Sequence, residues 1–151
     1  MKRIVLCAVA LFAESIFPES IYLSCDIIQF TGSEVEKKSD DRLRSILRII
    51  TEGKDFAKYK SYQFVAKKNL AVTDEKDVLY TLKNGEIVRL RAISVERAQR
   101  KNTVSVEVKV GKTDYGKQSF VDRDYLFLPA GQTNGSKPVD LYVAMRCPVF
   151  P

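Results

Sequence analysis

The chain has 151 residues, of which 45% are hydrophobic and 29% are charged, and this composition is typical of a single globular domain. Its formal net charge is +6, which is modestly basic. It contains no histidine, and this excludes serine–histidine and cysteine–histidine catalysis and removes the commonest transition-metal ligand.

The first fifteen residues have the pattern of a secretory signal peptide. Two basic residues precede an apolar run, residues 4–13, that is too short to cross a membrane as a helix. Small residues then predict cleavage before Ile16, which leaves one β-rich domain over residues 16–151. Removing two basic residues and one acidic residue lowers the net charge to +5. The alternative is that the apolar run is a buried strand or helix.

The next segment alternates between apolar and polar side chains. Residues 20–30 place Leu23, Cys25 and Ile27 on one face, which predicts a half-buried first strand. Residues 31–38 are polar and are interpreted as a linker.

One amphipathic helix is predicted over Ser39–Gly53. Ser39 is its predicted N-cap, and Gly53 is its predicted C′ residue. The apolar stripe at helical spacing comprises Leu43, Ile46, Leu47 and Ile50. Such a stripe can bind a partner, but we interpret it as the face that packs on the protein's own sheet.

The segment Phe56–Tyr62 interleaves aromatic residues with lysines. This pattern can stack on nucleic-acid bases and contact phosphates. Because a strand follows at Tyr62, we expect the rings to cover a sheet edge, and we expect no nucleic-acid partner if the chain is exported.

The strongest local signal is the hairpin of residues 78–95, which turns at Asn84-Gly85. These two residues favour a two-residue type I′ loop, which would place Leu82 opposite Ile87 and Tyr80 opposite Arg89. A short apolar segment, residues 70–72, precedes the hairpin.

Three strands are predicted after the hairpin. Thr103–Val110 alternates strictly, with its four valines on the buried face. Another strand is centred on residues 125–128, and residues 139–147 close the domain. The sequence therefore predicts an α+β fold that is mostly antiparallel β, a sheet or sandwich of about seven strands with one helix.

The cysteines offer one candidate disulfide. Cys25 lies in the first predicted strand and Cys147 in the last, and terminal strands are often neighbours. In an oxidising compartment the two would form a bond, whereas in a reducing one they would be free, buried thiols. Two cysteines without histidine do not make a structural zinc site, and no metal or cofactor is predicted.

No catalytic site is predicted, although acidic residues cluster at two places besides Asp40 and Asp41, which we assign to helix capping. Asp74 and Asp77 lie in one turn-like stretch, and Asp122 and Asp124 lie in another. We interpret both as solvated, where carboxyl pKa values stay ordinary and supply no general acid. The alternative is a carboxylate-dependent hydrolase of the cell envelope, which needs two such groups in one cleft.

Two exposed turns are the candidate contact surface. The first is basic, and the second is a glycine- and asparagine-rich loop. The candidate residues are Arg97, Arg100, Lys101, Gln132, Asn134 and Lys137. The net positive charge favours acidic partners or surfaces.

The order of these features resembles that of small, uncharacterised secreted β-rich proteins of Gram-negative, deltaproteobacterial type. The resemblance covers the signal peptide, Cys25, the helix, Phe56–Tyr62, the Asn84-Gly85 hairpin and residues 141–144. It implies a secreted β-rich domain and no activity. We therefore expect a non-catalytic exported binding or accessory protein of the periplasm or envelope, with an envelope or secreted protein partner and no transmembrane segment after cleavage.

Overall fold

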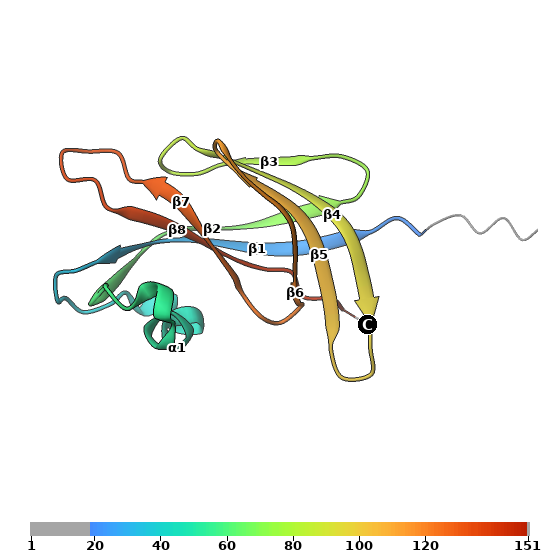
Figure 1. Ribbon diagram of the computed structural model, residues 1–151, viewed down its shortest axis with the longest axis horizontal. Helices are drawn as coiled ribbons and strands as arrows, with labels where there is room; N and C mark the ends of the chain where they lie inside the picture. Colours follow the sequence, from blue (N-terminus) through green and yellow to red (C-terminus); the bar gives the residue numbers. More distant parts are fainter. Residues whose placement is uncertain (1–18, 151) are drawn as a thin grey trace, which may run out of the picture.

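The computed structural model describes residues 19–150 and consists of two four-stranded antiparallel sheets with one helical segment (Figure 1). Strands make up 55% of it, which confirms the predicted α+β, mostly antiparallel class. The predicted signal peptide, residues 1–15, and its cleavage site lie outside the described residues. The strands are β1 (Tyr22–Ser33), β2 (Ser61–Thr73), β3 (Val78–Thr81), β4 (Ile87–Arg97), β5 (Asn102–Val110), β6 (Thr113–Val121), β7 (Leu126–Gln132) and β8 (Asp140–Arg146).

The two sheets pack face to face as a sandwich. Sheet A has the strand order β2-β1-β8-β7, and sheet B has the order β3-β4-β5-β6. The valines of β5 point into the core as their alternation predicted, and they meet Leu23, Cys25 and Ile27 of β1. Burial of these alternating apolar faces supplies the main driving force for the sandwich.

A second core lies on the opposite face of sheet A. There the helical segment, formed by η1 (Asp41–Leu43) and α1 (Arg44–Glu52), covers Ile28 and Phe30 of β1 (Figure 1). The molecule therefore has three layers, with β1 buried on both of its faces. The predicted helical stripe packs on the protein's own sheet, as we expected.

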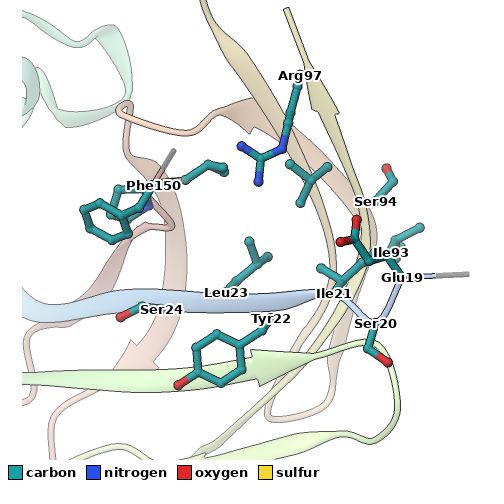
Figure 2. Close-up of a pocket in the computed structure, with 13 residues that line it drawn as sticks. Glu19, Ser20, Ile21, Tyr22, Leu23, Ser24, Ile93, Ser94, Arg97 and Phe150 are labelled. Carbon is teal, nitrogen blue, oxygen red and sulfur yellow. The ribbon is translucent and has the colours of Figure 1, made fainter.

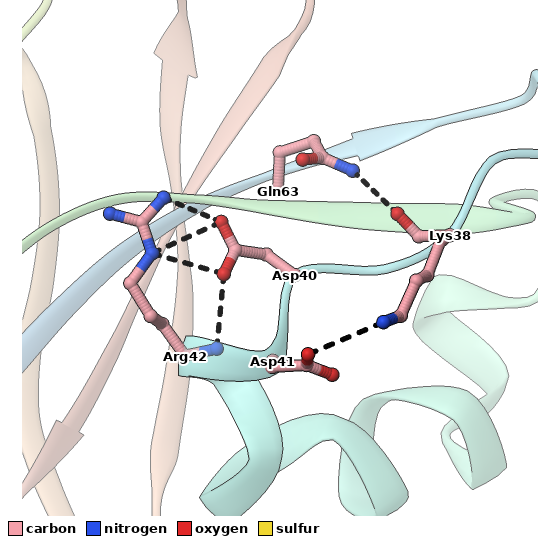
Figure 3. Close-up of polar contacts among 5 residues, drawn as sticks. All are labelled: Lys38, Asp40, Asp41, Arg42 and Gln63. Atoms are coloured by element: carbon pink, nitrogen blue, oxygen red, sulfur yellow. Dashed lines mark hydrogen bonds and ion pairs between the residues drawn. The ribbon is translucent and has the colours of Figure 1, made fainter.

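The start of the helical segment is fixed by Asp40 rather than by the predicted cap Ser39 (Figure 3). The Asp40 carboxylate accepts hydrogen bonds from the Arg42 side chain and backbone N–H, and these contacts lower its pKa to about 2. Ser39 instead accepts a hydrogen bond from the Tyr62 backbone N–H. Gly53 ends α1 with a φ of −76°, so it is not the predicted left-handed C′ residue.

The hairpin between β3 and β4 has a three-residue loop, closed by the hydrogen bond from the Leu82 N–H to the Glu86 C=O, so the predicted two-residue register was wrong. Thr81 pairs with Ile87 and Tyr80 with Val88. Only Gly85 of the loop has a positive φ, 88°, whereas a type I′ turn needs it at Asn84 as well. Because of this one-residue difference, Tyr80 and Arg89 lie on opposite faces of the hairpin instead of facing each other. Tyr80 packs against the core, and Arg89 is exposed to solvent.

Two strands differ from the sequence prediction. The short segment at residues 70–72 is the end of the 13-residue strand β2, which pairs with the full length of β1. Strand β6 was not predicted, and with it residues 19–150 form eight strands instead of about seven. None of the helices formed by the described residues is long and apolar enough to cross a membrane.

Candidate functional site

A disulfide joins the first and last strands at the place where their pairing ends. Cys25 and Cys147 are bonded with an S–S distance of 2.06 Å, which confirms the predicted pair. The last pair of the β1·β8 ladder is Asp26 with Arg146, so the cysteines occupy the next step of the same register. The disulfide therefore marks the end of the ladder.

Beyond the disulfide, β1 continues without a neighbour on its β8 side. The Cα atoms of Cys25 and Cys147 are 4.2 Å apart, the short spacing of a non-hydrogen-bonded pair. The backbone N–H and C=O groups of Tyr22 and Ser24 consequently point to the β8 side. Odd-numbered residues of this segment direct their backbone groups to the other side, toward β2. In agreement with this, the Ile21 N–H donates to the Asp74 carboxylate just past the end of β2.

The end of β8 explains why this edge of β1 is open. The residue that would face Ser24 is Pro148, which has no N–H to donate. The chain then leaves sheet A, and the Val149 N–H donates to the buried Asp122 carboxylate at 3.0 Å. Within residues 19–150, no backbone hydrogen bond joins β8 or the segment after it to Tyr22 or Ser24.

A β-bulge in β4 changes the direction of the side chains that face this edge. The register passes from Ala92–Val106 to Ser94–Ser105, so Ile93 is the extra residue. Before the bulge the odd-numbered residues Arg89 and Arg91 point to solvent. After it Val95 pairs with the buried Val104, and Arg97 lies on the same inner face. The bulge therefore directs Arg97 toward the groove, where its side chain remains exposed.

These features enclose a groove with a cavity volume of about 640 Å³. Figure 2 shows the Arg97 side chain pointing from β4 toward β1, with Phe150 and Glu19 at opposite ends. Tyr22, Ile93 and Phe150 are three of the eight exposed large hydrophobic residues in the described chain, and all three line the groove. Such a grouping of exposed apolar side chains is typical of a binding surface.

The structure does not bring the two predicted contact turns together. Arg100 and Lys101 lie in the β4–β5 turn, and Lys137 lies in the β7–β8 loop, toward the opposite end of the molecule (Figure 1). All of these residues are exposed. Of the six predicted contact residues, only Arg97 lines the groove.

The β7–β8 loop instead binds the hairpin turn of the same molecule. The Asn84 side-chain amide donates to the C=O groups of Ala130 and Gln132, and the Asn134 amide donates to the C=O of Asn84. The Gln132 amide also donates to Asp140. Gln132 and Asn134 therefore have a structural role in holding two loops together.

The aromatic segment Phe56–Tyr62 is part of the core, at a sheet face rather than an edge. Phe56 and Tyr62 are buried against Phe30. The Tyr59 hydroxyl contacts the Asp140 carboxylate and lies 2.7 Å from that of Tyr142. Burial and these contacts raise the pKa of Tyr59, and the contact with Tyr59 lowers the pKa of Asp140.

Three of the four acidic residues considered as catalytic candidates have local structural partners, and the fourth, Asp124, is exposed as expected. Asp77 forms ion pairs with Arg89 and Arg91, and Asp74 accepts the Ile21 N–H. Asp122 was wrongly expected to be solvated, because it is 3% exposed and accepts the Val149 N–H. In the part of the chain that the structure describes, no group of three or more cysteine or acidic side chains is placed to hold a metal.

A scan of protein-family models and searches of curated proteins and of solved structures found no match to this chain. The groove is therefore interpreted from its own geometry. The sequence indicated Arg97 only as a turn residue. The signal for the groove is Pro148 directly after Cys147, because proline cannot continue the donor pattern of a strand beside β1.

Proposed function

We propose that this protein is an exported, non-catalytic binding protein of the periplasm or cell envelope, and that the groove beside the Cys25–Cys147 disulfide is its binding site. The observation that carries the proposal is that the disulfide and the groove are adjacent. Structural disulfides persist in oxidising compartments outside the cytoplasm, so the bond supports export. The groove offers apolar side chains and one guanidinium group to a partner.

The resemblance to small secreted β-rich proteins of Gram-negative bacteria supports the same proposal. The predicted signal peptide would deliver the domain to an oxidising space, where Cys25 and Cys147 pair. The partner would be another envelope or secreted protein, and an acidic partner would suit the positive charge of the chain.

Export is tested by the intact mass of the native protein from fractionated cells, with and without reduction and alkylation. The expected species begins near Ile16, is found in the periplasm or medium, and takes up two alkyl groups only after reduction. A full-length cytoplasmic species with three alkylated thiols would overturn the proposal.

Binding is tested by cross-linking in isolated envelopes, with the protein carrying a photoreactive residue in place of Ile93 at the groove. A matched variant carries the same residue at Leu79, which is exposed on the outer face of sheet B. A defined cross-linked partner is expected from position 93 only. Cross-links of equal yield from both positions, or hydrolysis of an envelope polymer by the purified protein, would contradict the proposal.

A further inference from the structure

We infer that the groove takes an extended peptide strand that carries a carboxylate, and that this strand pairs with the free edge of β1 while its carboxylate reaches Arg97. The inference rests on the proposed binding function and names its ligand class. It follows from three independent features of the groove, which are its backbone edge, its position in line with β8 and its charge.

The backbone edge selects an extended chain. Tyr22 and Ser24 present N–H and C=O groups at every second residue, a repeat of about 7 Å along the strand. A peptide in the β conformation offers donors and acceptors at the same repeat, whereas a helix satisfies its own groups internally. Addition of a strand to an open sheet edge is a general mode of peptide recognition.

The place of the incoming strand is fixed by the fold. It lies in line with β8, because the chain turns away at Pro148 and is held there by the bond between Val149 and Asp122. The disulfide at Cys25 keeps the end of β8 beside β1. The seat is therefore formed before the peptide arrives, which lowers the entropy lost on binding.

The charge in the groove selects the carboxylate. Arg97 makes no ion pair with any residue in the range 19–150, and its side chain is exposed at the rim of the groove and points toward β1. A guanidinium group binds a carboxylate through two parallel hydrogen bonds. Glu19 at the other end would repel a second acid, so one carboxylate near Arg97 fits best. Ile93 and Phe150 favour apolar neighbours for that residue in the peptide.

An inward-pointing charge also occurs where a fold protects an edge from unwanted pairing. That role and the proposed one make opposite predictions for Arg97. If Arg97 protects the edge, its removal increases strand binding and self-association. If Arg97 recognises a carboxylate, its removal weakens the binding of acidic peptides.

The experiment uses the purified full chain and fluorescent ten-residue peptides of alternating valine and threonine, flanked by lysine for solubility. Each peptide has glutamate at one position, and the control set has glutamine there. Fluorescence anisotropy is expected to show binding of a glutamate peptide that is about tenfold tighter than that of its glutamine counterpart, since hydrogen bonds to charged groups are the stronger ones.

Two pairs of variants test the contacts. R97Q should weaken binding of the glutamate peptide about tenfold, whereas R100Q, which removes the same charge from the turn that follows β4, outside the groove, should change it less than twofold. Y22P removes an edge N–H and should abolish most of the binding. Y22A keeps that N–H and should retain most of it.

Hydrogen exchange identifies any other occupant. Slower exchange at the Tyr22 and Ser24 amides on peptide addition is expected. Slow exchange at these amides without peptide would overturn the inference, because the groove would then already be filled. Slowing that increases with protein concentration would identify the occupant as a second copy of the chain, and slowing independent of concentration would identify it as the chain itself. Equal binding by wild type and R97Q, or no binding by any peptide at millimolar concentration, would also overturn it. If such a result came with the position-93 cross-link intact, the proposed function would stand and only the strand ligand would be wrong.

Discussion

The Tyr59 hydroxyl donates a hydrogen bond to the Asp140 carboxylate, although the two residues are 81 positions apart in the sequence. Lys58 completes the contact with an ion pair to the same carboxylate at 3.1 Å. The pair joins the segment before β2 to the first residue of β8, at the end of sheet A that lies away from the disulfide. The two ends of the central strands are thus held by different chemistry.

Tyr59→Phe removes the hydroxyl and leaves the ring contacts with Tyr62 and Tyr142. The expected loss in the free energy of unfolding at pH 7 is about 1–3 kcal/mol, because the bond is to a charged group. The pKa of Asp140 is lowered in the folded state, so its contribution is present at neutral pH and is lost as the pH falls through the folded pKa. Urea titrations from pH 7 to pH 2 should therefore show the difference shrinking in acid.

Tyr115→Phe is the matched control for this pH dependence. Its hydroxyl donates to the backbone C=O of Pro129 and bonds no carboxylate in the described part of the chain. Its effect on stability should be the same at both ends of the pH range. A constant difference for Tyr59→Phe as well would mean that Asp140 does not gain stability from the hydroxyl.

Reduction of the Cys25–Cys147 bond should lower the free energy of unfolding by about 2–5 kcal/mol. The bond spans 122 residues of sequence, so it limits nearly the whole unfolded chain. The measurement is urea unfolding of the native protein with and without a phosphine reductant. The double variant Cys25→Ala/Cys147→Ala should have the stability of the reduced protein, and the reductant should not change it. An unchanged midpoint on reduction of the native protein would contradict the prediction.

Phe30→Ala should cost about 3–5 kcal/mol, because it empties the centre of the second core. Phe30 is fully buried, and four aromatic rings lie with their centroids within 6.3 Å of its own. The check is urea unfolding followed by circular dichroism. Phe150→Ala removes the same ring from a site that is 68% exposed and should change stability by less than about 0.5 kcal/mol. Similar losses for the two variants would show that the second core is not packed as described.

Asn84→Ala should release the β7–β8 loop from the hairpin turn. The side chain donates to two backbone C=O groups of residues 130 and 132, so its loss should cost about 1–2 kcal/mol. We expect faster hydrogen exchange at the Thr133 amide, whose N–H donates to the C=O of Val139 across the loop. Lys83→Ala changes the same turn at an exposed side chain and should leave that exchange rate unaltered. Equal rates in both variants would disprove the link.

The sequence predicted the elements whose pattern follows directly from burial. The four valines of β5 and the stripe containing Leu43 and Ile46 face a core, so their periodicity is complete. Strand β6 was missed because Thr113–Val121 lies at the edge of sheet B and is mostly polar on both faces. A strand that buries little apolar surface leaves little pattern to detect.

The groove could not be predicted because it depends on irregularities. Simple alternation along β4 assigns Arg97 to the same outer face as Arg89 and Arg91. The extra residue Ile93 reverses that assignment, and nothing in its apolar neighbours distinguishes it beforehand. The hairpin register failed for a similar reason, since Asn84-Gly85 suits two loop lengths that differ in one backbone angle.

The bulge at Ile93 lets β4 carry one residue more than its partner strand β5 without changing the pairs that follow. Deleting Ile93 would give a regular strand in which Val95 still faces Val104 and Arg97 still faces Asn102, so the guanidinium would keep its direction. A regular strand of the present length would instead turn Val95 out of the core and carry the guanidinium to the outer face of sheet B. In related chains, a one-residue gap at Ile93 would therefore mark a straighter strand with the arginine on the same face.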